Sequence, residues 1–300
     1  MITVIGSANL DLIATVDRLP RPGETVPGDG FSTAPGGKGA NQALAARRAG
    51  ADVRMVGAVG QDAFAEQALA LLQEGGVDLS QMRRAETATG IAVILVEAAG
   101  ENVIAIVPGG NGTVSPSDVA AAKLSADDFL MMQLEIPLDA VEAALAAARE
   151  AGTPSMLNTA PFRAEAGRLL AEADYVVANE TEFDLYAEAL DLAGDDREAR
   201  MRDFCARTGR IVVVTLGAEG VMAATPDGVV RARGLAITPV DTVGAGDTFC
   251  GYLAAGLEQG LALEEALQRA AVAGSLACLK PGAQPAIPFA AEIDEALKAN

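Results

Sequence analysis

The stretch SMLNTAPFRAEAGRLLAEADYVVAN, residues 155–179, contains a strand pattern, a helix pattern and a second strand pattern, in that order. The runs 155–157 and 175–178 are short and apolar, as buried strands are, whereas 163–171 has the Leu and Ala spacing of a helix. Alternation of this kind is typical of a parallel sheet, because a helix carries the chain back to the start of the next strand. The stretch therefore predicts an α/β fold.

The same alternation continues on both sides of this stretch. Further strands are expected at 2–5, 53–56, 129–132 and 211–215, and helices near 39–49, 63–74, 138–151 and 182–190. After residue 215 we expect two short strands, 220–225 and 229–233, and then helices near 247–259, 263–279 and 289–298. Residues 191–202 are rich in charge and are interpreted as a solvated loop and helix face. Together these elements predict a three-layer α/β/α sandwich with a mostly parallel central sheet.

Two segments, about 12–33 and 90–107, do not follow the strand and helix alternation. Both alternate apolar and polar residues around turns, and the second contains the expected turn Ala99-Gly100-Glu101-Asn102 between strands at 91–96 and 103–107. We expect them to form a small β-sheet lid that projects from the main sheet of a single domain spanning 1–300. Edge hairpins of the main sheet fit the same pattern equally well.

The composition excludes several classes of function. The chain has 41 acidic and 22 basic residues and a formal charge of −19, which disfavours a nucleic-acid partner. It has no His, so Ser-His-Asp catalysis and His-ligated metal sites are excluded. Cys205, Cys250 and Cys278 are far apart and odd in number, which argues against a disulfide framework. No long apolar run indicates a membrane partner, and we expect a cytoplasmic protein.

The strongest motif is Asp241-Thr242-Val243-Gly244-Ala245-Gly246-Asp247-Thr248-Phe249, a glycine-rich turn that leads into a predicted helix. Backbone N–H groups at such a helix start can bind a phosphoryl group without side-chain cations. Asp247 would then lie beside that group, where its carboxylate can accept a proton from an attacking alcohol. Taken by itself, Asp247 is equally a helix cap.

A second glycine-rich loop, Ala34-Pro35-Gly36-Gly37-Lys38-Gly39-Ala40-Asn41-Gln42-Ala43, also opens a predicted helix. It lacks the Ser or Thr that follows Lys in a Walker motif, which weakens a P-loop interpretation. Such a loop can present backbone N–H groups and the Asn41 amide to sugar hydroxyls. Asn9 and Asp11 follow the first strand and lie on one side of an extended segment, where they could contact a vicinal diol or form an Asx turn.

Further polar residues stand at the ends of predicted strands. They are Glu135, Asn179, Glu182, and Thr215, Gly217 and Gly220 of the segment 215–220. Ligands of open α/β sheets collect at the carboxyl ends of the strands, so these residues could converge on one crevice. Asn179 and Glu182 also have the spacing of a capping box, and an Asn/Glu pair could equally orient the waters of a Mg²⁺ ion.

Several more segments complete the set of motifs. These are residues 6–11, 22–25, 133–135 and Lys280-Pro281-Gly282-Ala283-Gln284-Pro285. In this order the motifs resemble those of the ribokinase-like, or PfkB-type, carbohydrate kinases through essentially the whole chain. The two glycine-rich loops, roughly two hundred residues apart, are far more specific together than either is alone.

The resemblance implies a set of roles. Asn9, Asp11, Gly37, Lys38, Asn41 and Glu135 would hold the sugar, Asp247 would be the general base, and backbone amides from Gly244, Ala245, Gly246 and Asp247 would form the anion hole. Asn179 and Glu182 would organise Mg²⁺ and the phosphates of ATP, and Thr215, Gly217 and Gly220 would border the nucleotide. A monovalent cation, typically K⁺, would be bound by Asp241, Val243 and the segment that includes Cys278, Pro281 and Gly282.

The chain departs from the family pattern at three places. Ala286 stands where these kinases commonly have Ser, so the K⁺ site lacks one hydroxyl ligand. Asn158-Thr159-Ala160-Pro161 replaces a common Asn-Pro-Ala-Pro, and Cys250 replaces a frequent Asn. None of these changes affects Asp247.

The resemblance implies ATP-dependent phosphorylation of D-ribose at the 5-hydroxyl, with Mg-ATP as co-substrate and a homodimer formed through the lid. The alternatives are a kinase for another pentose, a ketohexose or a nucleoside, and a non-catalytic protein that senses a sugar or nucleotide.

Overall fold

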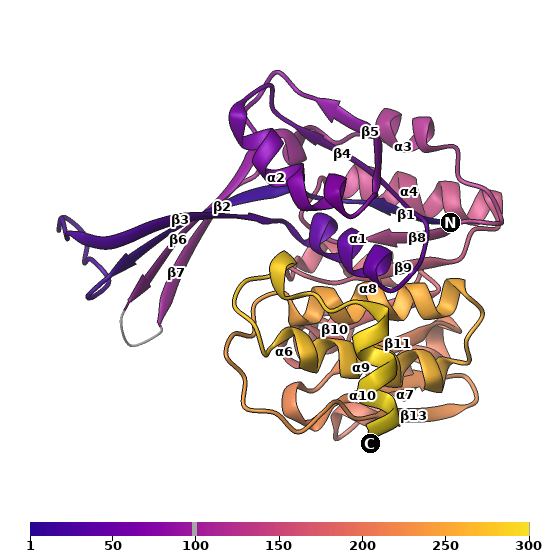
Figure 1. Cartoon of the computed structure of the whole chain (residues 1–300). Helices are drawn as coiled ribbons and strands as arrows, with labels where there is room; N and C mark the ends of the chain where they lie inside the picture. The colour runs from indigo at the N-terminus through magenta and orange to yellow at the C-terminus, as the bar shows by residue number, and fades with distance from the viewer. Residues whose placement is uncertain (98–100, 300) are drawn as a thin grey trace.

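A computed structural model describes residues 1–97 and 101–299 of the chain (Figure 1). Two of the four residues expected to form the turn at 99–102, Ala99 and Gly100, lie outside this described part. The strands on either side of that turn are described, and they end at Glu97 and begin again at Asn102.

The main sheet has the strand order β13-β12-β11-β10-β9-β8-β1-β4-β5. Its strands are β1 (Ile2–Ile5), β4 (Val53–Val59), β5 (Asp78–Arg84), β8 (Phe129–Met132), β9 (Ser155–Asn158), β10 (Tyr175–Asn179), β11 (Ile211–Thr215), β12 (Val221–Thr225) and β13 (Gly228–Ala232). Neighbours from β5 to β11 are parallel, and β12 and β13 add an antiparallel edge. The mostly parallel sheet predicted from the sequence is confirmed.

Two layers of helices cover the two faces of this sheet, which confirms the three-layer prediction. One layer contains α1 (Lys38–Arg48), α2 (Ala63–Glu74), α8 (Ala245–Glu258), α9 (Leu263–Ala277) and α10 (Ala290–Ala299). The other contains α3 (Pro116–Ala122), α4 (Leu138–Ala151), α5 (Gly167–Leu170), α6 (Glu180–Ala189) and α7 (Arg197–Thr208). The strands supply both cores because their side chains alternate: Val177 joins the first core and Val176 the second. In the described residues, we find no helix with the length and apolar character needed to span a bilayer.

A separate small sheet projects sideways from the body (Figure 1). Its strands are β2 (Asn9–Val16), β3 (Gly28–Gly36), β6 (Gly90–Glu97) and β7 (Asn102–Val107), in the order β3-β2-β6-β7. The β2 and β6 pair is parallel and the other two pairs are antiparallel. The interpretation as edge hairpins of the main sheet is therefore wrong. The small sheet begins at Asn9 rather than near residue 12, so Asn9 and Asp11 lie on its first strand.

Strand β5 and helix α3 were not predicted, and α7 was predicted only in part, as the helix face within 191–202, because little of each element is buried. The edge strand β5 is polar and mostly half-buried. Helix α3 has seven residues, of which only Val119 and Ala122 are buried. Helix α7 buries Met201, Phe204 and Cys205 beneath a charged face and begins where the Asp196 carboxylate accepts a hydrogen bond from the Ala199 N–H at 2.8 Å. The second half of the charged segment 191–202 is thus helical.

The carboxyl ends of the parallel strands all lie at one edge of the main sheet. Helix α6 begins at that edge directly after β10, and β2 leaves it only a few residues after β1. The starts of α1 and α8 lie near the same edge, since Asn41 of α1 is hydrogen-bonded to Asp247 of α8. This arrangement brings the predicted site residues from distant parts of the sequence to one region.

Candidate active site

The turn before α8 depends on a glycine. Gly244 caps the helix with φ +76°, a conformation that L side chains rarely adopt. A Cβ on Gly244 would also lie 2.8 Å from the Cα of Ala283. The turn places Asp247 in the first turn of the helix, where the residue is 8% exposed.

The start of α8 is open to a ligand. A Cβ built on Gly246 would meet no atom within 4 Å. The first N–H groups of a helix have no partner within the helix, and they carry the positive end of its dipole. The Ala245 N–H donates to the Thr242 carbonyl at a long 3.3 Å, so the N–H groups of Gly246 and Asp247 are the better donors for an anion. This space fits a phosphoryl group.

Both oxygens of the Asp247 carboxylate accept hydrogen bonds from α1. The Asn41 Nδ2 donates to Oδ2 at 2.9 Å, and the Gln42 Nε2 donates to Oδ1 at 2.9 Å. The buried Asn41 Oδ1 has no partner among the described residues and can accept a hydrogen bond from a ligand hydroxyl. Asn41, predicted to hold the sugar, therefore also holds the predicted base.

The loop at Gly36 and Gly37 is packed against the connection between β1 and β2. Gly37 has φ +89°, and a Cβ there would lie 2.7 Å from the backbone nitrogen of Asn9. The Ala40 N–H donates to the Ser7 carbonyl at 2.8 Å. Helix α1 therefore begins in contact with the segment that carries Asn9.

Asn9 and Asp11 lie two residues apart on β2 and so face the same side of the small sheet. The Asn9 Oδ1 accepts a hydrogen bond from the Asn111 Nδ2 at 2.7 Å, which leaves the Asn9 Nδ2 as a donor for a ligand. Burial, with a further contribution from the Glu135 carboxylate, raises the pKa of Asp11 to about 6. Asn111, which follows β7 of the small sheet, was not predicted.

Glu135 is hydrogen-bonded to two other segments of the site, the connection between β1 and β2 and the start of α1. Its Oε2 accepts hydrogen bonds from the Ser7 Oγ at 2.6 Å and from the Lys38 N–H at 3.0 Å. The Lys38 side chain lines a pocket with Asp247 and Glu182. The carboxylates of Asp247, Glu135 and Glu182 raise the pKa of Lys38 despite its burial, so its amine stays charged. That charge lies in the pocket that the start of α8 borders.

Two adjoining pockets meet at this point. The smaller, of about 140 Å³, is lined by Lys38, Asn179, Glu182, Gly244, Asp247 and Cys250, among others. The larger, of about 760 Å³, is bordered by Gly217, Gly220, residues 234–239 and parts of α8 and α9. Thr215 and Gly246 line both pockets. A long ligand can therefore extend from the larger pocket past the start of α8 to Asp247.

Asn179 and Glu182 form a reciprocal capping box at the start of α6. The Asn179 Oδ1 accepts from the Glu182 N–H at 2.8 Å, and the Glu182 Oε2 accepts from the Asn179 N–H at 3.1 Å. Both residues nevertheless line the smaller pocket. Among the described residues, no cluster of three or more Asp, Glu or Cys side chains could hold a metal by itself. Protein ligands alone would thus be few, as is usual for Mg²⁺ beside phosphates.

Asp241 organises the loop beside Gly244. Its carboxylate accepts hydrogen bonds from the Val243 N–H at 3.0 Å and the Gly282 N–H at 2.8 Å, so Asp241, Val243, Pro281 and Gly282 lie close together. The Cys278 carbonyl accepts from both the Val240 and the Asp241 N–H. These two bonds use its lone pairs, which counts against Cys278 among the predicted cation ligands.

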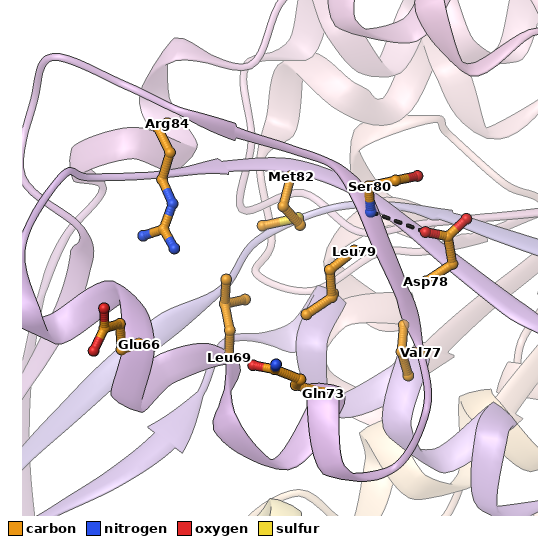
Figure 2. Close-up of a pocket in the computed structure, with 9 residues that line it drawn as sticks. All are labelled: Glu66, Leu69, Gln73, Val77, Asp78, Leu79, Ser80, Met82 and Arg84. Carbon is orange, nitrogen blue, oxygen red and sulfur yellow. Dashed lines mark hydrogen bonds between the residues drawn. The ribbon is translucent and has the colours of Figure 1, made fainter.

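A further pocket of about 700 Å³ lies between α2 and the edge strand β5 (Figure 2). It is lined by Glu66, Leu69, Gln73, Val77, Asp78, Leu79, Ser80, Met82 and Arg84. It contains none of the predicted site residues. Figure 2 shows one hydrogen bond among these residues, in which the Asp78 carboxylate accepts from the Ser80 N–H at 2.9 Å.

Sequence reasoning did not single out Gln42, Gln133, Asn158 or Asn111 as site residues. The sequence does contain a sign of their importance, because they are polar residues in segments that are otherwise apolar. Gln42 lies in α1 among buried Ala residues, and Gln133 directly follows the buried strand β8. A buried amide requires partners, and these amides find most of theirs around Asp247 and Asn9, although the buried Gln133 Oε1 has no partner among the described residues.

The chain is similar in sequence and in fold to proteins that are already known. The chain is 36% identical over 308 residues to a ribokinase of Schizosaccharomyces pombe, covering 98% of this chain and 96% of that one. It is 32% identical over 303 residues to a deoxyribokinase of Salmonella typhi, covering 100% and 99%. The structure of Arabidopsis thaliana ribokinase complexed with ribose and ATP has a TM-score of 0.89 at 31% identity, covering 99% and 98%. Residues 1–290 match the model of the pfkB family carbohydrate kinases, and the chain belongs to that family.

Proposed function

We propose that this kinase transfers the γ-phosphoryl group of ATP to the 5-hydroxyl of D-ribose. The observation that carries the proposal is that Thr215 and Gly246 border both adjoining pockets. A nucleotide in the larger pocket would extend its phosphates past the start of α8 toward Asp247. The similarity to the Arabidopsis thaliana ribokinase complexed with ribose and ATP supports this choice of substrates.

The sugar would lie between β2 and α1. Asn9 would donate a hydrogen bond through its Nδ2, because Asn111 occupies its Oδ1, and the ionised Asp11 would accept one. A donor and an acceptor on the same side of β2 suit two neighbouring hydroxyls. Asn41 would accept through its free Oδ1, and Gly37 and Glu135 would close the site. The 5-hydroxyl would then point toward Asp247.

In the reaction, the oxygen of the sugar 5-hydroxyl would bond to the γ-phosphorus, and Asp247 would accept the proton of that hydroxyl. The bond between the γ-phosphorus and the oxygen that leaves with ADP would break. The N–H groups of Gly246 and Asp247, with a smaller contribution from Ala245, would stabilise the charge on the moving phosphoryl group. The Lys38 amine would add a positive charge beside the phosphoryl group. Asn179 and Glu182 would orient the waters of Mg²⁺, which neutralises phosphate charge when bound.

We also propose that a monovalent cation, K⁺, binds beside Asp241 with backbone carbonyls from Val243, Pro281 and Gly282. The missing hydroxyl at Ala286 would make this binding weaker than in relatives with Ser. We place the reaction in the cytoplasm, where ATP is available and the free thiols of Cys205, Cys250 and Cys278 would remain reduced.

A panel of sugars with Mg-ATP tests the proposed function. ADP release should be fastest with D-ribose, and kcat/KM for 2-deoxyribose should be lower by about tenfold or more, because a site that hydrogen-bonds a hydroxyl discriminates against its absence. Each sugar is measured with and without K⁺. A ketohexose or nucleoside as best substrate would change the assignment, and no ADP release with any sugar would favour the sensor alternative.

Replacing the proposed base tests the mechanism. Asp247→Asn should lower kcat by about 10² or more, the scale of losing a general base, while ribose and ATP still bind. Single-turnover kinetics and calorimetric binding measure the two properties separately. Near-normal turnover of this variant would remove Asp247 from the role.

Asp11 should make ribose binding dependent on pH. Its pKa of about 6 means that the carboxylate is mostly ionised at pH 7.5 and mostly protonated at pH 5. Because the ionised form is the better acceptor, KM for ribose should rise several-fold between pH 7.5 and pH 5. Asp11→Asn should weaken ribose binding at both values and abolish the difference. An Asp11→Asn variant that keeps the wild-type pH dependence would assign it to another group.

We propose that the small sheet is a lid and that it packs against the lid of a second copy. Strand β7 is exposed along its whole length, with Ile104 at 52% and Ile106 at 51%. Ile106 pairs with Ala92, which pairs with Asp11, so these two Ile residues lie on the side of the sheet that faces the sugar. A partner lid would cover this apolar strip.

Analytical ultracentrifugation should therefore show a dimer that the double variant Ile104→Asp with Ile106→Asp converts to monomer. The control Phe31→Ser removes a 70% exposed side chain from the opposite side of the lid and should leave the dimer intact. A monomeric wild-type protein at micromolar concentration would contradict the proposal.

A further inference from the structure

A chain of buried amides ends on the Asp247 carboxylate. The Gln133 Nε2 donates to the Gln42 Oε1 at 2.7 Å, and the Gln42 Nε2 donates to the Asp247 Oδ1 at 2.9 Å. Gln42 and Gln133 are both 0% exposed, and neither lines the pockets around Asp247. Only Gln42 touches the proposed base, and Gln133 acts on that carboxylate through Gln42.

Hydrogen-bond chemistry fixes the orientation of each amide in this chain. An ionised carboxylate can only accept, so Gln42 must present its Nε2 to Asp247. The same Nε2 also donates to the Asn158 Oδ1 at 3.1 Å, and the Asn158 Nδ2 donates to the Val177 carbonyl at 3.1 Å. The Gln42 Oε1 then faces Gln133, which must in turn present its Nε2. Reversing any one amide would place two acceptors against each other.

Two backbone positions beside these amides have no space for a side chain larger than that of glycine. A Cβ on Gly6 would lie 2.2 Å from the Gln133 Oε1, so the end of β1 must be glycine for Gln133 to fit. A Cβ on Gly251 would lie 2.6 Å from the Gln42 carbonyl and 2.4 Å from the Ala45 Cβ, so α8 can approach α1 only at a glycine. The close contact of α1 with α8 brings Gln42 within reach of Asp247.

We propose that Gln42 and Gln133 are positioning residues that aim the Asp247 carboxylate at the sugar hydroxyl and hold it as a proton acceptor. The inference rests on the proposed function, because it takes Asp247 as the base. Asn41 and Gln42, both on α1, each donate a hydrogen bond to a different oxygen of the Asp247 carboxylate. These two bonds hold the plane of the carboxylate in one orientation. Proton transfer requires the carboxylate to be aligned with the hydroxyl, and a small misalignment lowers the rate of the reaction strongly.

The decisive experiment compares the kcat–pH profiles of Gln42→Glu, Gln133→Leu and wild type with ribose and Mg-ATP. In Gln42→Glu a second carboxyl group faces Asp247, so the pair should hold a proton to higher pH and the acidic limb should shift upward by about one unit or more. Gln133→Leu releases Gln42 without placing any new group near Asp247, and should lower kcat several-fold. KM for ribose and for ATP should stay within about twofold of wild type in both variants.

The other titratable groups around Asp247 are Lys38 of α1, Glu182 of α6 and Cys250 of α8, and the variants leave all three in place. The control Gln67→Glu makes the same change of charge at an exposed position of α2, where the side chain can still accept from the Thr33 Oγ1, and should leave the profile unchanged. If Gln42→Glu does not fold, Gln42→Met provides the same kcat and KM comparison without adding a charge.

Folded variants whose kcat and acidic limb match wild type would overturn the positioning role while leaving the proposed function intact. Wild-type protein that turns over no sugar would overturn both. Equal losses of kcat and of ribose binding would show that the amides only support the fold.

Discussion

The first turn of α8 has to hold two negative charges close together, the carboxylate of Asp247 and the anion that the open helix start would bind. Both are stabilised mainly by hydrogen-bond donors: the amides of Asn41 and Gln42 for the carboxylate, and backbone N–H groups for the anion. A protein with a formal charge of −19 can bind phosphate in this way without a basic surface. The Asp247 carboxylate raises the pKa of Lys38, so the Lys38 amine adds a positive charge close to Asp247.

Several glycines make this geometry accessible. Gly37 and Gly244 have positive φ and begin the two helices that meet at the site, and Gly251 allows those helices to touch. Gly246 leaves the anion position open, and Gly6 leaves space for Gln133. The glycine-rich loops therefore allow the close packing that places Asn41 and Gln42 on Asp247, and under the proposed function they would also bind the ligands.

Much of the architecture could be predicted from the sequence, because buried parallel strands such as β1 and β8 are short apolar runs in a regular alternation with helices. Strand β5 was missed because none of its residues is fully buried, and the α7 segment was interpreted only as a solvated loop and helix face because it buries only Met201, Phe204 and Cys205. The convergence of Asn9, Asn41 and Asp247 could be predicted only through the resemblance to a family. The roles of Gln42, Gln133 and Asn111 depend on contacts between distant segments, which no local pattern encodes. Lys38, which the resemblance places at the sugar, lines the pocket that also contains Glu182 and Asp247.

The most direct measurement is a crystal structure of the protein with ribose and a non-hydrolysable ATP analogue. The account predicts the terminal phosphate at the N–H groups of Gly246 and Asp247, the base of the nucleotide in the larger pocket, and the 5-hydroxyl of ribose within hydrogen-bond distance of the Asp247 carboxylate. A complex with the nucleotide or the sugar bound elsewhere, for example between α2 and β5, would contradict it.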